Sequence, residues 1–145
     1  MLKILIVDDE IKIREVVKEY AEVYGYECDE ASDGMEAVEK VRDNDYDCVI
    51  LDIMMPRLDG FSACRKIKEM KNVPVIMLSA RSEEEDKLFS FSMGIDDYVT
   101  KPFSPKELMA RIKAVSERNR RSVHSTFRYE DLVVDFDARD VFIDK

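Results

Sequence analysis

The organisation of the chain is clearest in residues 47–70, DCVILDIMMPRLDGFSACRKIKEM. Asp47–Leu51 is a short, strongly apolar run, which is typical of a strand buried on both faces of a sheet. A loop with Pro56 follows, and Asp59 can cap a helix that continues to about Met70. The segment therefore predicts a strand, a loop and a helix, which is the repeating unit of a parallel α/β fold.

The same unit recurs on both sides of this segment. Further strands are expected at Leu2–Val7, Tyr26–Ala31, Pro74–Leu78 and Asp97–Thr100. Helices are expected at Ile11–Tyr24, from Asp33 to about Arg42, from Ser82 to Met93 and from Ser104 to about Arg118. Five strands that alternate with five helices predict an α/β fold with a doubly wound parallel sheet and helices on both faces. Residues 26–31 and 97–100 are less uniformly apolar, so we expect them to be the edge strands.

Composition narrows the class of protein. The 145 residues are 46% apolar, which suffices for one average domain with a proper core. Lys and Arg number 23 against 32 Asp and Glu, a net charge of −9 that disfavours holding a nucleic-acid backbone by charge alone. No apolar run approaches the roughly 18 residues of a membrane helix, and the N-terminus does not resemble a signal peptide, so we expect a cytoplasmic protein without membrane contact.

Cysteine and histidine exclude several kinds of site. Cys28, Cys48 and Cys64 are widely spaced, so we expect buried, reduced thiols rather than a zinc site. His124 is the only histidine, which excludes metal clusters and triads that need several.

Polar residues follow four of the predicted strands. Asp8 and Asp9 follow the first strand, Asp52 the third, Ser79 the fourth and Lys101 the fifth. Ligands of open parallel sheets bind outside the carboxyl ends of the strands, so these side chains are expected to converge. Taken singly, Asp9 has an alternative role as a helix cap, and the others as turn, strand-end or surface residues; their coincidence at strand ends is what favours a site.

Three carboxylates at one sheet edge need compensating charge. Each close pair costs about 4 kcal/mol at an effective dielectric constant of 20. A hard divalent cation with oxygen ligands, such as Mg²⁺, offsets this repulsion, and Lys101 adds a further positive charge. A metal, a lysine and a hydroxyl around a carboxylate are the groups that phosphoryl transfer uses, and the carboxylate itself can form an aspartyl phosphate.

Four segments resemble the receiver domain of two-component response regulators. They are Ile6–Glu10 (IVDDE), Leu51–Gly60 (LDIMMPRLDG), Leu78–Ala80 (LSA) and Tyr98–Phe103 (YVTKPF). The resemblance covers residues 1 to about 120, in order and at the usual spacing. It implies a flavodoxin-like (βα)5 fold with strand order 2-1-3-4-5, which agrees with the edge strands expected above.

The resemblance also implies a metal site and a phosphoacceptor. Asp52 is the implied phosphoacceptor. Asp9, Asp52 and the Met54 carbonyl are the implied direct ligands of Mg²⁺, with Mn²⁺ as an alternative, and Asp8 is implied to act mainly through a coordinated water.

Three further residues receive roles from the same resemblance. Lys101 is implied to pair with the phosphoryl oxygens, and Ser79 to donate a hydrogen bond to the phosphoryl group after transfer. Tyr98 is the implied switch aromatic, outward before phosphorylation and inward after it. The family more often has Thr at the position of Ser79, and serine keeps the hydroxyl with a less constrained χ1 angle.

Gly94–Tyr98 and Glu107–Ile112 resemble the OmpR/PhoB class of these regulators. That class implies homodimerisation on phosphorylation through the fourth helix, the fifth strand and the fifth helix. The implied cross-chain pairs are Lys87 with Glu107, Asp97 with Arg111, and Asp96 with Arg118. The alternative is that these are solvated surface charges, worth about 0–1 kcal/mol each.

The resemblance suggests three parts of the chain: a receiver domain at 1–120, a linker at 121–126, and the first strands of a winged-helix effector domain at 127–145. We expect two short strands near Leu132–Phe136 and Asp140–Ile143, and no recognition helix is present. The chain is therefore expected to be a fragment of a transcriptional regulator. Its partners are expected to be a sensor histidine kinase and a second copy, with promoter DNA for the full-length protein only.

Two other classes of protein are alternatives to a phosphorylation switch. A Mg²⁺-dependent phosphatase of the haloacid-dehalogenase type also uses an aspartyl nucleophile, but it needs an acid two residues later, where this chain has Met54. An FMN-binding flavodoxin needs a phosphate loop of neutral groups, which Asp8, Asp9 and Glu10 would repel. The predicted protein is a signal carrier rather than a metabolic enzyme, and it catalyses only its own phosphorylation and dephosphorylation.

Overall fold

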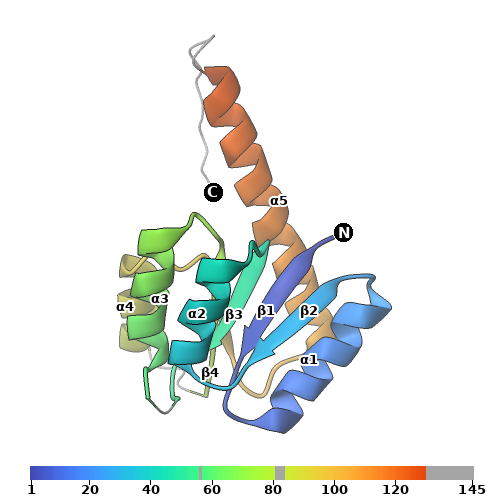
Figure 1. The fold of residues 1–145 in the computed structure, drawn as a ribbon, viewed down its shortest axis with the longest axis vertical. Coiled ribbons are helices and arrows are strands. Elements are labelled where there is room, and N and C mark those ends of the chain that lie inside the picture. Colours follow the sequence, from blue (N-terminus) through green and yellow to red (C-terminus); the bar gives the residue numbers. More distant parts are fainter. Residues whose placement is uncertain (56, 81–83, 130–145) are drawn as a thin grey trace.

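The computed structural model describes residues 1–55, 57–80 and 84–129. The strands are β1 (Lys3–Val7), β2 (Glu27–Ala31), β3 (Cys48–Asp52), β4 (Val75–Ser79) and β5 (Asp97–Thr100). The helices are α1 (Ile11–Val23), α2 (Gly34–Asp43), α3 (Gly60–Met70), α4 (Glu84–Ser92) and α5 (Pro105–Tyr129). Strands and helices alternate strictly, as predicted (Figure 1).

The strands form one parallel sheet in the order β2-β1-β3-β4-β5. Both the fold class and the strand order predicted from the sequence are therefore confirmed, with β2 and β5 at the edges. Every residue of β3 and β4 is buried, which explains their continuous apolar sequence. This order places the carboxyl ends of β1, β3 and β4 next to one another.

Successive side chains of each strand enter two separate cores, one on each face of the sheet. Leu51 and Met77 pack on one face with Val41 of α2 and Ile67 of α3. The opposite face is covered by α1 and α5, whose buried residues join those of the strands in the second core: Ile4, Ile6, Val17, Ala21, Ile50, Ile76, Leu78, Leu108 and Ile112. Figure 1 shows this layered arrangement of helices around the sheet.

The predicted helix starts are met by side-chain caps. Asp33 Oδ1 accepts a hydrogen bond from the Glu36 N–H at 2.9 Å, and Glu36 reaches back to the Ser32 N–H at 2.8 Å. In a standard capping box the Glu36 side chain would bind the N–H of the cap residue Asp33, whereas here it binds the N–H of Ser32, one residue earlier. Asp59 caps α3 through the Ser62 N–H at 2.9 Å. In α5 the Ser104 hydroxyl accepts from the Glu107 N–H at 3.2 Å, whereas Ser82 lies outside the described residues.

The main difference from expectation is the length of α5. We expected this helix to end near Arg118, but it continues to Tyr129, so the segment predicted as a linker is helical. Residues 119–129 contain neither Gly nor Pro, and hence no strong signal that stops a helix. In Figure 1 the end of α5 extends beyond the sheet. The strands expected near 132–136 and 140–143 lie outside the described residues.

Two further observations concern the cysteines and the hydrophobicity of the helices. All three cysteines are free thiols; Cys48 and Cys64 are buried as expected, whereas Cys28 is only partly buried. Burial raises the pKa of Cys28 to about 12 and that of Cys64 to about 11. Among the described residues, none of the helices has both the length and the apolar character that a transmembrane span requires.

Candidate functional site

Acidic side chains from two central strands meet at the carboxyl edge of the sheet. Asp8 and Asp9 follow β1, and Asp52 is the last residue of β3. One carboxylate oxygen from each of the three lies within 4.8 Å of the others. Lys101, just after β5, places its Nζ 3.0 Å from Asp8 Oδ2 and 3.6 Å from Asp52 Oδ2. The sheet therefore brings together the carboxylates and the lysine that the sequence singled out.

Asp8 is the most deeply enclosed of the three acids. Its Oδ1 accepts a hydrogen bond from the Glu10 N–H at 2.9 Å. Its buried Oδ2 forms the ion pair with Lys101 at 3.0 Å, and no other described group donates to this oxygen. Burial raises the pKa of Asp8, against the opposing effects of the Glu10 N–H and of Lys101.

Asp52 is 4% exposed and lies between opposing charges. Burial raises its pKa to about 6, and the negative charge of Asp8 acts in the same direction, while Lys101 opposes it. The Met54 N–H approaches Asp52 Oδ1 at 3.4 Å. At neutral pH most of the Asp52 carboxyl groups are therefore ionised, although the environment does not favour the charge.

Lys101 keeps its positive charge in this site. Burial of the ammonium group acts to lower its pKa, but the carboxylates of Asp8 and Asp52 outweigh this effect and raise it. The Lys101 N–H also donates to the Ser79 carbonyl at 2.7 Å, so the loop after β5 is fixed to the end of β4.

The donor set fits a hard divalent cation. Three carboxylates lie together, Lys101 is paired with two of them, and no described group other than this ammonium reaches the buried Asp8 Oδ2. Asp9 is exposed, and it does not cap α1, because the residue at the cap position is Glu10 and no side chain caps that end. Oxygen-only ligands of this kind match Mg²⁺ or Mn²⁺ rather than zinc. Met54 is 63% exposed, and the part assigned to its carbonyl stays a prediction.

Ser79 and Tyr98 lie on the neighbouring strands. Ser79 is fully buried at the end of β4 and pairs in register with Thr100. Tyr98 is 8% exposed, with its ring among buried residues and the Lys87 Nζ 5.8 Å from the ring centroid. The structure thus has the inward position of Tyr98, and its alternation with an outward position stays a prediction.

The residues predicted to pair across a dimer have partners within the chain. Arg111 contacts Asp97 at 2.7 Å and Glu107 at 3.0 Å. Asp96 pairs with Lys68 at 3.1 Å, and the Arg118 Nη2 donates to the Asp96 carbonyl at 3.5 Å. Cross-chain pairing of Asp97 with Arg111 and of Asp96 with Arg118 would therefore replace contacts that these residues make within the chain, and it stays a prediction.

Two arginines near the acidic cluster were not found from the sequence. Arg14 of α1 donates to the Asp8 carbonyl at 2.7 Å and to Glu30 at 2.9 Å. Arg57, in the loop after β3, contacts Asp33 at the start of α2. The sequence around Arg14 and Arg57 has no motif that marks either residue, so neither can be told from an ordinary surface arginine.

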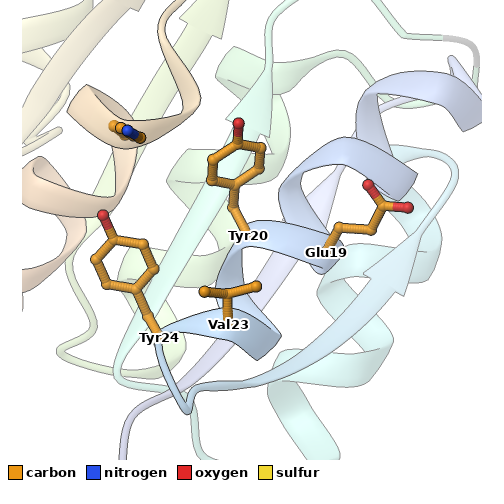
Figure 2. Close-up of a pocket in the computed structure, with 5 residues that line it drawn as sticks. Glu19, Tyr20, Val23 and Tyr24 are labelled. Carbon is orange, nitrogen blue, oxygen red and sulfur yellow. The ribbon is translucent and has the colours of Figure 1, made fainter.

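A separate groove of about 470 Å³ lies between α1 and α5. Figure 2 shows Glu19, Tyr20, Val23 and Tyr24 on its α1 side, and Lys106 lines it from α5. None of the acidic-cluster residues lines this groove.

Comparison with known proteins identifies the family. A family model described as the response regulator receiver domain matches residues 4–113. The chain belongs to this family. The chain is 40% identical to the transcriptional regulatory protein SrrA of Staphylococcus aureus over 150 aligned residues. The alignment covers 98% of this chain and 62% of the relative. The chain thus spans less than two thirds of the length of that relative.

Solved structures agree with this assignment. Response regulator DrrB, a Thermotoga maritima OmpR/PhoB homologue, is 38% identical with a TM-score of 0.74, over 81% of this chain and 54% of that chain. The receiver domain of a sensor histidine kinase from Pseudomonas aeruginosa, described with a magnesium ion coordinated in its active-site cleft, is 31% identical with a TM-score of 0.74, over 80% of this chain and 98% of that chain. The receiver domain predicted from the four motifs is confirmed.

Proposed function

We propose that this receiver domain is a phosphorylation switch in which Asp52 accepts a phosphoryl group from a sensor histidine kinase. The observation that carries the proposal is the placement of Asp52, buried at the end of β3 between the carboxylate of Asp8 and the ammonium of Lys101. Membership of the receiver family and the magnesium described for a similar receiver domain support the same reading.

Each residue of the site has a distinct role in the phosphoryl transfer. An ionised Asp52 oxygen attacks phosphorus, the bond from phosphorus to the donor breaks, and an aspartyl phosphate forms. Lys101 faces the charge that arrives with the phosphoryl group. Asp8, Asp9, Asp52 and the Met54 carbonyl would hold Mg²⁺, or Mn²⁺ in its place, and when bound it neutralises charge on the phosphoryl oxygens.

The switch follows from residues beside the acceptor. The Ser79 hydroxyl would donate to the new phosphoryl oxygens, and Tyr98 would remain inward, so the inward state of this region becomes the favoured one. The face of α4, β5 and α5 would then form a homodimer through the pairs Lys87–Glu107, Asp97–Arg111 and Asp96–Arg118.

The rest of the proposal concerns the whole protein. We propose a receiver domain at 1–120, a connecting segment at 121–126 that continues α5, and the start of a winged-helix effector domain at 127–145. The relative SrrA is described as a transcriptional regulatory protein, which supports promoter DNA as a partner of the full-length protein. The chain would act in the cytoplasm as a signal carrier whose catalysis is limited to its own phosphorylation and dephosphorylation.

Acetyl phosphate with Mg²⁺, followed by intact mass measurement, tests the proposal. The wild-type chain is expected to gain the mass of one phosphoryl group, and Asp52→Asn is expected to gain none. Asp43→Asn, a change at an exposed aspartate of α2, is the matched control and should behave as wild type. Equal labelling of Asp52→Asn, or no labelling of the wild type, would sink the proposal.

A further inference from the structure

Arg57, which lies between β3 and α3, has an unusual backbone conformation. Arg57 has φ of 67°, and among the described residues no other non-glycine has a positive φ. This left-handed region is unfavourable for a residue with a side chain, except for short polar residues such as Asn and Asp. Such a conformation persists only where surrounding contacts hold it, and it is most frequent at functional sites.

The contact that holds Arg57 is a two-pronged ion pair with Asp33. Arg57 Nε donates to Asp33 Oδ2 at 3.0 Å, and Nη2 donates to Asp33 Oδ1 at 3.0 Å. Asp33 is buried and also caps α2 through the Glu36 N–H. The Arg57 side chain is exposed, as in an ordinary surface ion pair. Two features distinguish this pair: the Asp33 carboxylate is fixed at the start of α2, and the guanidinium donates two hydrogen bonds to it.

The backbone that follows Arg57 is fitted closely to its neighbours. A Cβ atom at Gly34 would overlap the Leu58 carbonyl oxygen, so the loop lies directly against the first residue of α2. A Cβ atom at Gly60 would overlap the Asp52 carbonyl oxygen, and the Gly60 N–H donates to the Ile53 carbonyl at 2.9 Å. The loop is therefore connected to Asp33 at one side and to the backbone of Asp52 at the other.

We propose that Arg57 and Asp33 are a positioning pair that holds the loop after β3, and with it the Met54 and Asp52 oxygens, in the arrangement that binds the divalent cation. The inference rests on the proposed function, because that function places the cation at Asp52 and Met54. Neither residue belongs to the acidic cluster, so we assign them no direct contact with the phosphoryl group. Their effect is exerted through the contacts of Leu58 with Gly34 and of Gly60 with the backbone of Asp52 and Ile53, as groups behind metal ligands act elsewhere.

Glycine and asparagine substitutions separate this role from a general effect on folding. Arg57→Gly removes the guanidinium and also removes the steric penalty at φ of 67°, because glycine adopts this region freely. Asp33→Asn keeps an oxygen that can cap α2 but loses the charge. Arg42→Ala is the matched control, because Arg42 is 60% exposed, close to the 62% of Arg57, and pairs with Asp43 away from the site.

Mg²⁺ affinity, measured by calorimetric titration of the full chain, is the first readout. Arg57→Gly and Asp33→Asn are each expected to bind Mg²⁺ about tenfold more weakly than the wild type. Their combination should be no weaker than the worse single variant, since one interaction is lost in all three. Arg42→Ala should bind as the wild type. Wild-type affinity in both single variants, with the wild type itself binding, would overturn the inference.

Amide hydrogen exchange of the metal-free chain is the second readout. The Gly60 amide, bonded to Ile53, is expected to exchange faster in Arg57→Gly and Asp33→Asn than in the wild type or in Arg42→Ala. If the wild type failed to bind Mg²⁺, the proposed function would fail, while faster exchange in these two variants would still support the positioning role. Unchanged exchange at Gly60 in both variants would contradict it.

Discussion

At the scale of the residue, Asp52 is held where its charge is unfavourable. Burial raises its pKa to about 6, against an unfolded value of about 3.9. Between these values the folded chain binds more protons than the unfolded chain, so the free energy of unfolding falls as the pH rises from about 4 to about 6. Above about pH 6 this loss in the free energy of unfolding stays constant, so it is still present at neutral pH. A reactive carboxylate here therefore reduces the stability of the metal-free fold.

Asp52→Asn is consequently expected to be more stable than the wild type in the absence of metal. The gain at pH 7 should be up to about 3 kcal/mol, and it should shrink to less than about 0.5 kcal/mol near pH 4, where Asp52 is protonated in the folded chain and about half protonated in the unfolded chain. Urea unfolding in EDTA at the two pH values measures this difference. Added Mg²⁺ should narrow it at pH 7, because the cation compensates the carboxylate only in the wild type. Equal stability of the two proteins at pH 7 in EDTA would contradict the prediction.

Lys101 provides the compensating charge, and its loss is expected to be costly. Lys101→Met leaves the buried Oδ2 of Asp8 without a cation, and breaking a buried pair in this way destabilises a protein by about 3–5 kcal/mol. Lys40→Met removes a half-exposed ion pair with Glu36 and should cost less than about 1 kcal/mol. Urea unfolding of both variants at pH 7 provides the comparison. Similar small losses in the two would mean that Lys101 does not support Asp8.

The positions of these residues were predictable, but their supports were not. Asp8, Asp52 and Lys101 each follow a strand, and parallel strands deliver their carboxyl ends to one edge, so sequence order alone brings them together. Arg57 adopts a left-handed backbone although arginine has no preference for it. The sequence indicates that the Asp33 carboxylate caps a helix, but not that it also pairs with Arg57. Contacts between loops distant in the sequence leave no periodic signal.

At the scale of the element, the start of α2 combines a cap with an ion pair. Asp33→Ala should lose about 1–2 kcal/mol of stability from the cap, with a further loss from the pair with Arg57. Asp59→Ala removes the cap of α3 and is the matched comparison. Urea unfolding at pH 7 should therefore give a larger loss for Asp33→Ala than for Asp59→Ala. Equal losses would mean that the ion pair adds nothing to the cap.

The pH dependence of the Asp33→Ala effect separates its electrostatic part. Burial acts to raise the pKa of Asp33, but the Glu36 N–H and Arg57 outweigh it and lower the pKa. A lowered pKa in the folded state gives stability that is complete above the unfolded value near 4 and is lost as the pH falls through the folded value. The difference between wild type and Asp33→Ala should thus be constant above about pH 5 and shrink below about pH 4.

Helix ends were predictable where a side chain or a glycine marks them. The caps at Asp33, Asp59 and Ser104 were each identified from the sequence, and the elements otherwise differ from expectation by one or two residues. The exception is the end of α5, where a polar composition suggested a connector. Polarity does not end a helix by itself, because helices end at residues such as Gly and Pro, and residues 119–129 contain neither.

At the scale of the whole molecule, the face formed by α4, β5 and α5 presents charges already paired within the chain. Arg111 contacts both Asp97 and Glu107, and these carboxylates hold the pKa of the guanidinium above its usual value. A dimer related by a two-fold axis would use each cross-chain pair twice. The proposed pairing of Asp97 with Arg111 across the interface can therefore be separated from the pairing within one chain.

A mixture of two charge-reversed variants distinguishes the Asp97–Arg111 pair across the interface from the pair within one chain. In Asp97→Arg both positions are basic, and in Arg111→Asp both are acidic, so each variant alone should fail to dimerise when phosphorylated, because like charges meet twice across the interface. An equimolar mixture places opposite charges together at both contacts and should restore the dimer, although neither chain regains its internal pair. Sedimentation velocity with acetyl phosphate and Mg²⁺ measures the outcome, with Arg42→Glu on α2 as a control that should dimerise as the wild type. A mixture that stays monomeric while the wild type dimerises would place the Asp97–Arg111 contact within the chain alone.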